Sequence, residues 1–211
     1  MIHHSIKISF IGMSGVGKST WSSRLEKEKG FKRYCCDDLI EKELSLELKE
    51  LGYEGINDVS KWMGQPYDKR YKKNSQKYLE LEAKVIRNIL RQIKKAGPKE
   101  NIAVDATGSI IYMPASLMSE LKKETKIVYL ETPDSEIEEM IKKYFGNSKP
   151  VIWRGIFKSR KNEENIQALK RCYANLLKSR KNKYEALAEV TINYRDQMDK
   201  KFTVDDLLKQ I

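Results

Sequence analysis

Residues 12–19 read GMSGVGKS and follow the apolar run IKISFI at residues 6–11. These eight residues fit the pattern G-x-x-x-x-G-K-[ST] of a phosphate-binding loop, the P-loop. Glycines let such a loop curl so that successive backbone N–H groups point inward, and the helix that follows adds the positive end of its dipole. The stretch therefore predicts a strand, a phosphate-binding loop and a helix in succession. The four defining positions are Gly12, Gly17, Lys18 and Ser19.

The loop predicts ATP and Mg²⁺ as cofactors. Lys18 is placed to reach the β- and γ-phosphates, and the hydroxyl of Ser19 is placed to ligate Mg²⁺. A Gly-rich turn can also be simple punctuation between elements. Here the spacing, the lysine, the hydroxyl and the preceding strand agree, which favours nucleotide binding. The expected cofactor-binding residues of the loop are Gly12, Ser14, Gly15, Val16, Gly17, Lys18, Ser19 and Thr20.

The composition fits one domain over residues 1–211. The chain is 40% hydrophobic and 34% charged, long enough for one well-formed core and short for two. No apolar run is long enough for a membrane span, and the first residues lack the features of a secretory signal. Cys35, Cys36 and Cys172 have neither disulfide-framework nor metal-site spacing. We expect a cytoplasmic protein with reduced thiols and no membrane partner.

The net charge of +11 is concentrated in one segment. Residues 141–183 contain thirteen basic and two acidic residues, so this segment alone accounts for the whole excess. Concentrated positive charge indicates a polyanion nearby. ATP fits that description, and so does RNA.

Strand-like and helix-like stretches alternate along the chain. This alternation predicts a parallel sheet covered by helices on both faces. Strands are expected at about residues 6–11, 32–36, 101–106, 126–131 and 190–194. Helices are expected at about 18–29, 38–51, 75–96, 114–124, 134–145 and 163–188, the last of them broken, with a closing helix from about 204. Residues 52–69 are expected to be irregular and to lie on the substrate side.

Polar residues follow the second and third expected strands. Ligands of an open α/β sheet bind beyond the carboxyl ends of its strands. Asp37 and Asp38 follow the second strand, where one could cap the next helix and the other accept a hydrogen bond from a substrate hydroxyl or act as its base; we favour Asp37 for function. Asp105 ends the third strand, where P-loop enzymes often place a carboxylate that holds Mg²⁺. The small-residue turn behind it is Thr107, Gly108 and Ser109.

A segment at about residues 146–165 mixes Gly, Pro and cations. It is interpreted as a lid that brings positive charge over the phosphates and excludes water. Lys149, Arg154 and Arg160 are the candidate cations, and Lys149 and Arg154 are expected to bind the cofactor. For each cation singly, a solvated surface position is the alternative.

With these pieces assembled, the chain resembles the shikimate kinase family of P-loop small-molecule kinases. The resemblance runs in order through FIGMSGVGKST, CCDDLIEKEL, ATGS and KPVI to LLKSRKNKYEALAEVTINY. In the last stretch, Arg180 and Tyr184 keep the spacing of the family's Arg-Asn-Pro-x-Tyr segment. The resemblance implies a three-layer α/β/α fold with five parallel strands in the order 2-3-1-4-5. It also implies a lid, Mg²⁺, and phosphoryl transfer from ATP to a hydroxyl of a small molecule.

Further site residues follow from the resemblance. Asp37 matches the aspartate that holds the acceptor hydroxyls, and Thr107 and Gly108 match the start of the family's Thr-Gly-Gly-Gly turn. Arg180 matches an arginine that grips the acceptor carboxylate. Lys149 stands where the family has a lid arginine.

The chain departs from the family at the acceptor site. Cys35 replaces the first acid of an Asp-x-Asp pair, the glycine-rich turn reads TGSI, and Asp105 is an unusual acid before it. Aligning YLELE with the family's Phe-Arg-x-x-Glu puts Leu79 where a second carboxylate-binding arginine belongs. Arg70 or Lys77 could substitute for that arginine from nearby.

The sequence thus predicts an ATP-dependent kinase that phosphorylates a hydroxyl of a small, anionic metabolite. Lys18, Asp37 and Asp105 are the expected catalytic residues, with either aspartate as the base. Expected substrate contacts are Asp37, Asp38, Thr107, Gly108, Ser109 and Arg180, and expected metal ligands are Ser19 and Asp105.

Two alternatives remain beside this prediction. The first is a nucleotide or RNA-end kinase that uses the basic 141–183 segment and the stretch PYDKRYKKNSQKY at 66–78, in which tyrosines alternate with cations. An exposed helix face with snorkelling side chains explains that stretch better. The second alternative is a P-loop binding module without turnover, which the intact Lys18 and Ser19 disfavour. The oligomeric state is left open by the sequence.

Overall fold

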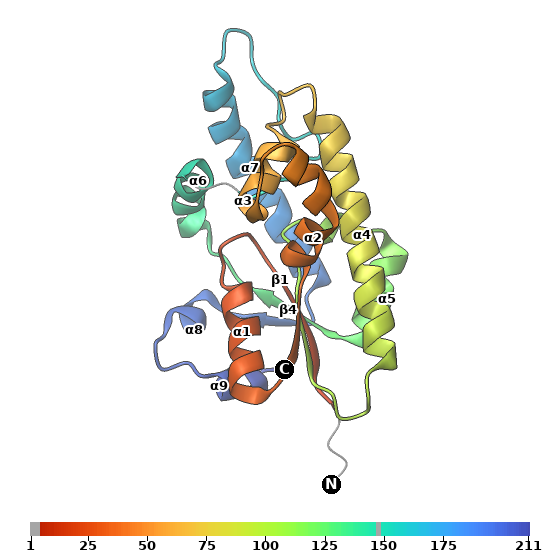
Figure 1. The fold of residues 1–211 in the computed structure, drawn as a ribbon. Helices are drawn as coiled ribbons and strands as arrows, with labels where there is room; N and C mark the ends of the chain where they lie inside the picture. Colours follow the sequence, from red (N-terminus) through yellow and green to blue (C-terminus); the bar gives the residue numbers. More distant parts are fainter. Residues whose placement is uncertain (1–4, 147–148) are drawn as a thin grey trace.

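Five parallel strands form one sheet at the centre of the protein in a computed structural model that describes residues 5–146 and 149–211 (Figure 1). The strands lie in the order β2-β3-β1-β4-β5, and every neighbouring pair is parallel. The expected α/β fold and the expected order 2-3-1-4-5 are therefore confirmed. The strands are β1 (Lys7–Ile11), β2 (Lys32–Cys35), β3 (Ile102–Asp105), β4 (Lys126–Leu130) and β5 (Val190–Ile192).

Helices connect and cover the strands. They are α1 (Lys18–Lys29), α2 (Cys36–Glu50), α3 (Gly55–Met63), α4 (Tyr71–Lys95), α5 (Ala115–Glu124), α6 (Ile137–Gly146), α7 (Asn165–Leu187), α8 (Tyr194–Met198) and α9 (Val204–Lys209). Two short 3₁₀ helices are η1 (Ile110–Tyr112) and η2 (Asp134–Glu136). Within the described part of the chain, no helix is both long and apolar enough to span a membrane.

The sheet separates two hydrophobic cores. On one side, α1 and α9 cover the sheet through a small core in which the edge of Trp21 meets Phe202 at a ring-centroid distance of 5.4 Å. On the other side, α4 and α5 bury a larger core that includes Ile86 and Leu121 (Figure 1). Strands β1, β3 and β4 lie between these two cores. Most of their residues are buried because their side chains face one core or the other.

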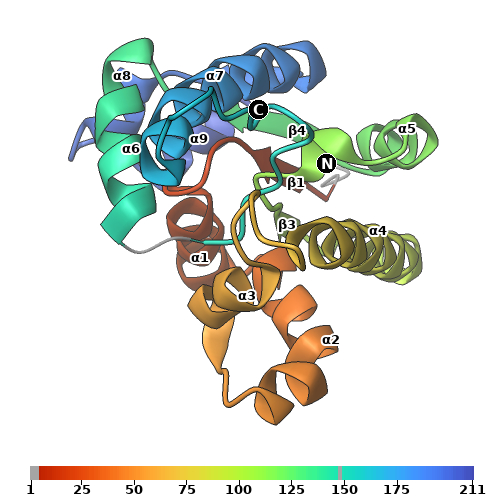
Figure 2. The same ribbon diagram turned by 90° about the horizontal axis from the view of Figure 1, so that it is seen from above.

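The carboxyl ends of the strands meet at one edge of the sheet. Asp105 at the end of β3 lies in register with Phe10 of β1 and with Cys35 of β2. The P-loop and the first turn of α2 therefore begin beside Asp105. Seen from above, the 149–164 segment that leads to α7 crosses over the centre of the molecule (Figure 2). Residues 147 and 148 of the expected lid lie outside the described residues.

The helices differ from the sequence expectation in several places, one of which is α8, a short helix where none was expected. The expected break in the 163–188 helix is wrong: α7 is continuous, because its sequence holds neither Pro nor Gly. The 52–69 stretch is not wholly irregular, because α3 buries Val59, Trp62 and Met63 on one face. Helix α4 begins at Tyr71, four residues earlier than expected, because the Tyr71 hydroxyl is held by backbone groups of Val151 and Trp153.

Candidate functional site

The P-loop has the geometry of an anion-binding nest. Gly15 and Gly17 adopt φ values of +81° and +103°, which glycine tolerates best. Helix α1 starts at Lys18, and no side chain caps its first turn. The N–H groups at this end are therefore available to an anion in the pocket that the loop lines.

Lys18 is folded back over the loop. Its Nζ donates to the carbonyl oxygens of Gly12 at 3.1 Å and Met13 at 2.8 Å. Burial lowers the pKa of the Lys18 ammonium, and the nearby Asp105 and Asp37 carboxylates offset part of this effect. A bound phosphate would supply the buried Lys18 ammonium with negative charge, which Asp105 and Asp37 supply only in part.

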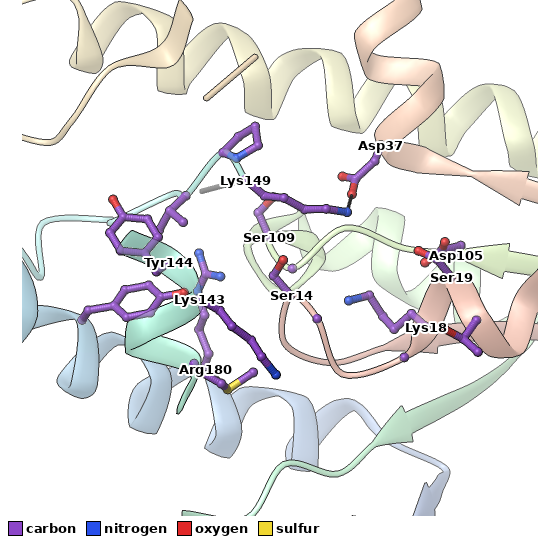
Figure 3. A pocket seen from close by; sticks show the side chains of 18 of the residues that line it. Ser14, Lys18, Ser19, Asp37, Asp105, Ser109, Lys143, Tyr144, Lys149 and Arg180 are labelled. Carbon is purple, nitrogen blue, oxygen red and sulfur yellow. Dashed lines mark hydrogen bonds and ion pairs between the residues drawn. The ribbon is translucent and has the colours of Figure 1, made fainter. Parts of the chain in front are cut away.

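One pocket joins the loop to the ends of β2 and β3 and to α7 (Figure 3). Its volume is about 310 Å³. Twelve residues that the sequence predicted line it: Ser14, Gly15, Gly17, Lys18, Ser19, Thr20, Asp37, Asp105, Gly108, Ser109, Lys149 and Arg180. In Figure 3, Lys18, Asp37 and Asp105 lie across the pocket from Lys143, Tyr144 and Arg180.

Seven lining residues were missed by sequence reasoning: Tyr78, Met140, Lys143, Tyr144, Pro150, Val151 and Tyr173. Tyr144 and Tyr173 stack with their ring centroids 4.4 Å apart, which ties α6 to α7 at the pocket wall. Tyr78 carried a signal in the sequence, because it stands in the aligned YLELE stretch. The apolar residues of α6 and α7 looked like ordinary core positions.

Five expected site residues lie outside the pocket lining. Gly12 shapes the loop, and Val16 is buried in the smaller core. Asp38 is exposed on the far side of the helix start, and the Thr107 hydroxyl donates to Glu82. Arg154 is exposed and lies 5.5 Å from the ring centre of Tyr112.

Asp37 is paired across the pocket. Its Oδ2 accepts a hydrogen bond from Lys149 Nζ at 2.9 Å, which links α2 to the 149–164 segment (Figure 3). Burial opposes the charge of Lys149, but Asp37 more than compensates, so the pKa of Lys149 is raised. Neither Asp37 nor Asp38 caps α2 through its side chain, since the N-cap residue is Cys35. The helix-cap interpretation of these aspartates is therefore wrong.

Asp105 is held more rigidly. Only 4% of its surface is exposed, and its Oδ2 accepts a hydrogen bond from Arg33 Nη2 at 3.2 Å. Arg33 is itself fixed by a 2.9 Å hydrogen bond from Nε to the Ser22 hydroxyl. This arrangement orients the carboxylate and leaves its other oxygen for a ligand.

The donor set suits Mg²⁺. Asp105 and Ser19 line the same pocket and offer hard oxygen ligands. Among the residues that the structure describes, no group of three or more His, Cys, Asp or Glu side chains could hold a metal by itself. Mg²⁺ that is bound with a nucleotide needs few protein ligands, because phosphates and water supply the rest.

Glu82 supports the turn at residues 107–109. It is fully buried and accepts hydrogen bonds from the hydroxyls of Thr107 and Ser109, the latter at 2.6 Å. Burial raises the pKa of Glu82 to about 7, although both hydroxyls oppose that shift. Ser109 lines the pocket, so Glu82 positions one pocket wall without lining it.

Arg180 places a cation at the far end of the pocket. It is 5% exposed, and its Nη2 donates to the Ile152 carbonyl at 2.9 Å. Its Nε has no hydrogen-bond partner within the described ranges. A Cβ at Gly108 would lie 3.3 Å from Arg180 Nη1, and the Tyr184 hydroxyl donates to the Gly108 carbonyl at 2.6 Å. Arg180 can therefore receive an anionic group against a glycine backbone.

The proposed substitutes for the second arginine point elsewhere. Lys77 forms an ion pair with Glu47, which also accepts a hydrogen bond from Trp62 Nε1. Arg70 is exposed and lies against Gly64. Neither residue lines the pocket. Arg160, the remaining cation expected in the lid, is exposed.

Comparison with solved structures identifies the fold. Shikimate kinase from Acinetobacter baumannii, solved in complex with shikimate, is similar over 97% of this chain and 90% of its own, with TM-score 0.57 and 20% identity. The shikimate kinase of Bacteroides thetaiotaomicron gives TM-score 0.60 at 13% identity, with 97% and 95% covered. The shikimate kinase of Aquifex aeolicus gives TM-score 0.57 at 17% identity, with 97% of this chain and 95% of its own covered. No family profile matches the sequence, and no curated protein does.

At these identities the likeness shows the fold. The protein has the shikimate kinase-like fold of P-loop kinases.

Proposed function

We propose that this protein is an ATP-dependent phosphotransferase that phosphorylates a hydroxyl of a small, anionic metabolite. The observation that carries the proposal is the single pocket in which the P-loop faces Asp37, Asp105 and Arg180. A phosphate site, two carboxylates and a buried cation are the parts that phosphoryl transfer to an anionic alcohol requires. The fold shared with shikimate kinases supports the same reaction class.

Each residue of the pocket has a separate role in the proposed reaction. Lys18 exchanges the loop carbonyls for oxygens of the β- and γ-phosphates, and the N–H groups of the loop surround them. Ser19 and Asp105 would hold Mg²⁺, which would neutralise charge on the phosphates. Asp37 orients the acceptor hydroxyl and takes its proton. As the hydroxyl oxygen bonds to the γ-phosphorus, the bond from that phosphorus to the ADP oxygen breaks and ADP leaves. Catalysis is then mainly positioning and charge neutralisation.

Four further residues complete the proposal. Arg180, which lines the pocket, binds the anionic group of the acceptor through its guanidinium. Lys149 serves as the cation of a lid that covers the phosphates. Residues 37–80 form the substrate side of the same domain. Gly108 and Ser109 form the wall against which the acceptor lies.

An RNA-end acceptor is less well supported than a small molecule. Of the three tyrosines in the 66–78 stretch, Tyr78 is buried and the Tyr71 hydroxyl is engaged by backbone groups. Only Tyr67 is exposed, and its ring lies against Phe157. The stretch therefore lacks a row of open rings on which bases could stack.

The test is ADP release by the purified protein with ATP and Mg²⁺. The acceptor panel contains shikimate, sugar acids, polyols, nucleosides, nucleoside monophosphates and a 5′-hydroxyl RNA oligomer. We expect turnover with a small anionic alcohol and a loss of about 100-fold or more in Lys18→Met, because the variant cannot neutralise the phosphates.

Two results would contradict the proposal. Turnover confined to the RNA oligomer would change the acceptor class. ADP release that Lys18→Met leaves unchanged would show that the loop is not the site of the reaction. A matched melting curve for Lys18→Met establishes that the variant is folded.

A further inference from the structure

Tyr78 combines a buried ring with a hydroxyl that has no partner in the part of the chain that the structure describes. The residue lies on α4 and is 2% exposed, yet it lines the pocket. Its hydroxyl makes no hydrogen bond to any residue in ranges 5–146 and 149–211, and it is not among the fully enclosed unpartnered hydroxyls. The small exposed part of Tyr78 is therefore directed to the cavity.

Two of the charged groups around Tyr78, Asp37 and Arg180, are those proposed to bind the acceptor. Burial raises the pKa of Tyr78 well above its usual value, Asp37 and Glu82 raise it further, and Arg180 opposes them. These neighbours come from α2, α4 and α7. The hydroxyl therefore keeps its proton at neutral pH and remains a hydrogen-bond donor.

The second arginine of the family's clamp is not rebuilt at this end of the pocket. Leu79 contributes its side chain to the larger core rather than to the pocket. Lys77 and Arg70 are directed elsewhere, as described above. In the alignment YLELE against Phe-Arg-x-x-Glu, the chain thus exchanges a phenylalanine and an arginine for a tyrosine and a leucine. Relative to that pattern, the site gains a neutral hydrogen-bond donor, the Tyr78 hydroxyl, and loses one arginine.

We infer that Tyr78 determines acceptor specificity by donating its hydroxyl hydrogen to an uncharged oxygen of the acceptor. Arg180, with Lys143 on the same side of the pocket (Figure 3), then binds the acidic group. The acceptor class is a small polyhydroxylated compound with one acidic group and, beside the reacting hydroxyl, a second hydroxyl, ether or carbonyl oxygen for Tyr78. This inference rests on the proposed function and narrows its substrate.

The experiment compares wild type with Tyr78→Phe on the best acceptor of the panel. Phenylalanine keeps the buried ring and removes only the hydroxyl. We expect kcat/KM for the acceptor to fall about tenfold, the value of one uncharged hydrogen bond, while the KM for ATP stays within about twofold. An acceptor analogue that lacks the bonded oxygen should be used equally well by both proteins.

Tyr129→Phe is the matched control. Tyr129 is also buried, and its hydroxyl has no hydrogen-bond partner among the residues that the structure describes. It does not line the pocket, so its variant should keep the wild-type kcat/KM. An equal loss in both variants would show a general packing effect and overturn the inference. Unchanged kcat/KM in Tyr78→Phe, with wild type active, would overturn it and leave the proposed function standing. Absence of turnover by wild type on every acceptor would overturn both.

Discussion

Asp37 and Asp105 lie in the same pocket but have different partners. Asp37 faces Lys149, which comes from the long segment between α6 and α7 and is itself partly exposed. Asp105 is buried against Arg33, which Ser22 holds in place. An acceptor can replace the more exposed Lys149 ammonium more readily than the Arg33 guanidinium, which is less exposed and is held at two points. This contrast favours Asp37 for the acceptor and Asp105 for the metal.

Isosteric variants separate these two roles. Asp37→Asn should lower kcat about 100-fold or more with little change in the Mg²⁺ dependence, because it removes the proton acceptor. Asp105→Asn should shift the Mg²⁺ concentration for half-maximal rate upward, because a carboxylate ligand is lost. Initial rates over a Mg²⁺ titration measure both effects. A wild-type Mg²⁺ dependence in Asp105→Asn would remove this residue from the metal site.

Residues whose role depends on local sequence could be predicted, and those that depend on distant packing could not. Lys18, Asp37 and Asp105 follow from a motif or from a strand end. The alignment of YLELE with Phe-Arg-x-x-Glu put Glu82 at the motif glutamate, but the sequence did not show what it contacts. Its burial against Thr107 and Ser109 depends on which face of α4 meets the sheet, and that is decided by tertiary contacts.

At the scale of the element, the P-loop depends on a close backbone approach at Gly12. This residue adopts φ +144°, and a Cβ there would lie 2.9 Å from the Leu130 carbonyl oxygen. The loop leaves β1 directly beside β4, so neither strand can yield without loss of pairing.

Gly12→Ala should therefore cost about 2 kcal/mol or more of unfolding free energy and weaken nucleotide binding. Urea denaturation and titration with a fluorescent ADP analogue measure the two effects. Gly97→Ala is the control, because Gly97 has open space around it and an ordinary φ, and it should change stability by less than about 0.5 kcal/mol. Equal stability of the two variants would show that the loop tolerates a side chain at Gly12.

The order of the elements could be predicted, whereas several of their boundaries could not. Alternating strands and helices fix a parallel sheet, and the resemblance supplied its strand order. Helix α3 escaped prediction because its signal is a nine-residue stretch that begins at Gly55, and the burial of this stretch depends on the hydrogen bond from Trp62 to Glu47 of α2. The start of α4 depends equally on a contact with the distant 149–164 segment.

At the scale of the whole molecule, Glu82 makes folding stability depend on pH. Its pKa is about 7 in the folded protein and about 4.5 in an unfolded chain. The folded state therefore binds the proton more tightly, so the stability from this group is full below pH 4.5 and is lost as the pH rises through 7.

Between pH 5 and pH 8, wild type should lose roughly 2 to 3 kcal/mol of unfolding free energy relative to Glu82→Gln, which does not titrate at this position. Urea denaturation of both proteins at each pH measures the difference. Glu80→Gln lies on the exposed face of the same helix and should follow wild type. Parallel pH profiles for wild type and Glu82→Gln would show that the carboxyl of Glu82 ionises normally.

The sequence showed which segment carries the excess positive charge, but it did not show which of these side chains line the pocket. The basic 141–183 segment supplies Lys143, Lys149 and Arg180 to the pocket. Other cations of the segment are paired on the surface, as Arg171 is with Glu163 and Lys181 with Asp134. Part of the excess positive charge therefore lies around the phosphate site, and the rest lies on the surface.

Trp21, whose edge meets Phe202 in the smaller core, also adjoins the P-loop. Its indole Cδ1 lies 3.7 Å from where a Cβ of Gly17 would be, and the Arg24 guanidinium is 4.6 Å from its ring centre. Indole emission responds to nearby charge and to small movements of packed neighbours. The chain thus carries an intrinsic optical reporter of loop occupancy, and replacing Trp62 and Trp153 by phenylalanine would isolate its signal.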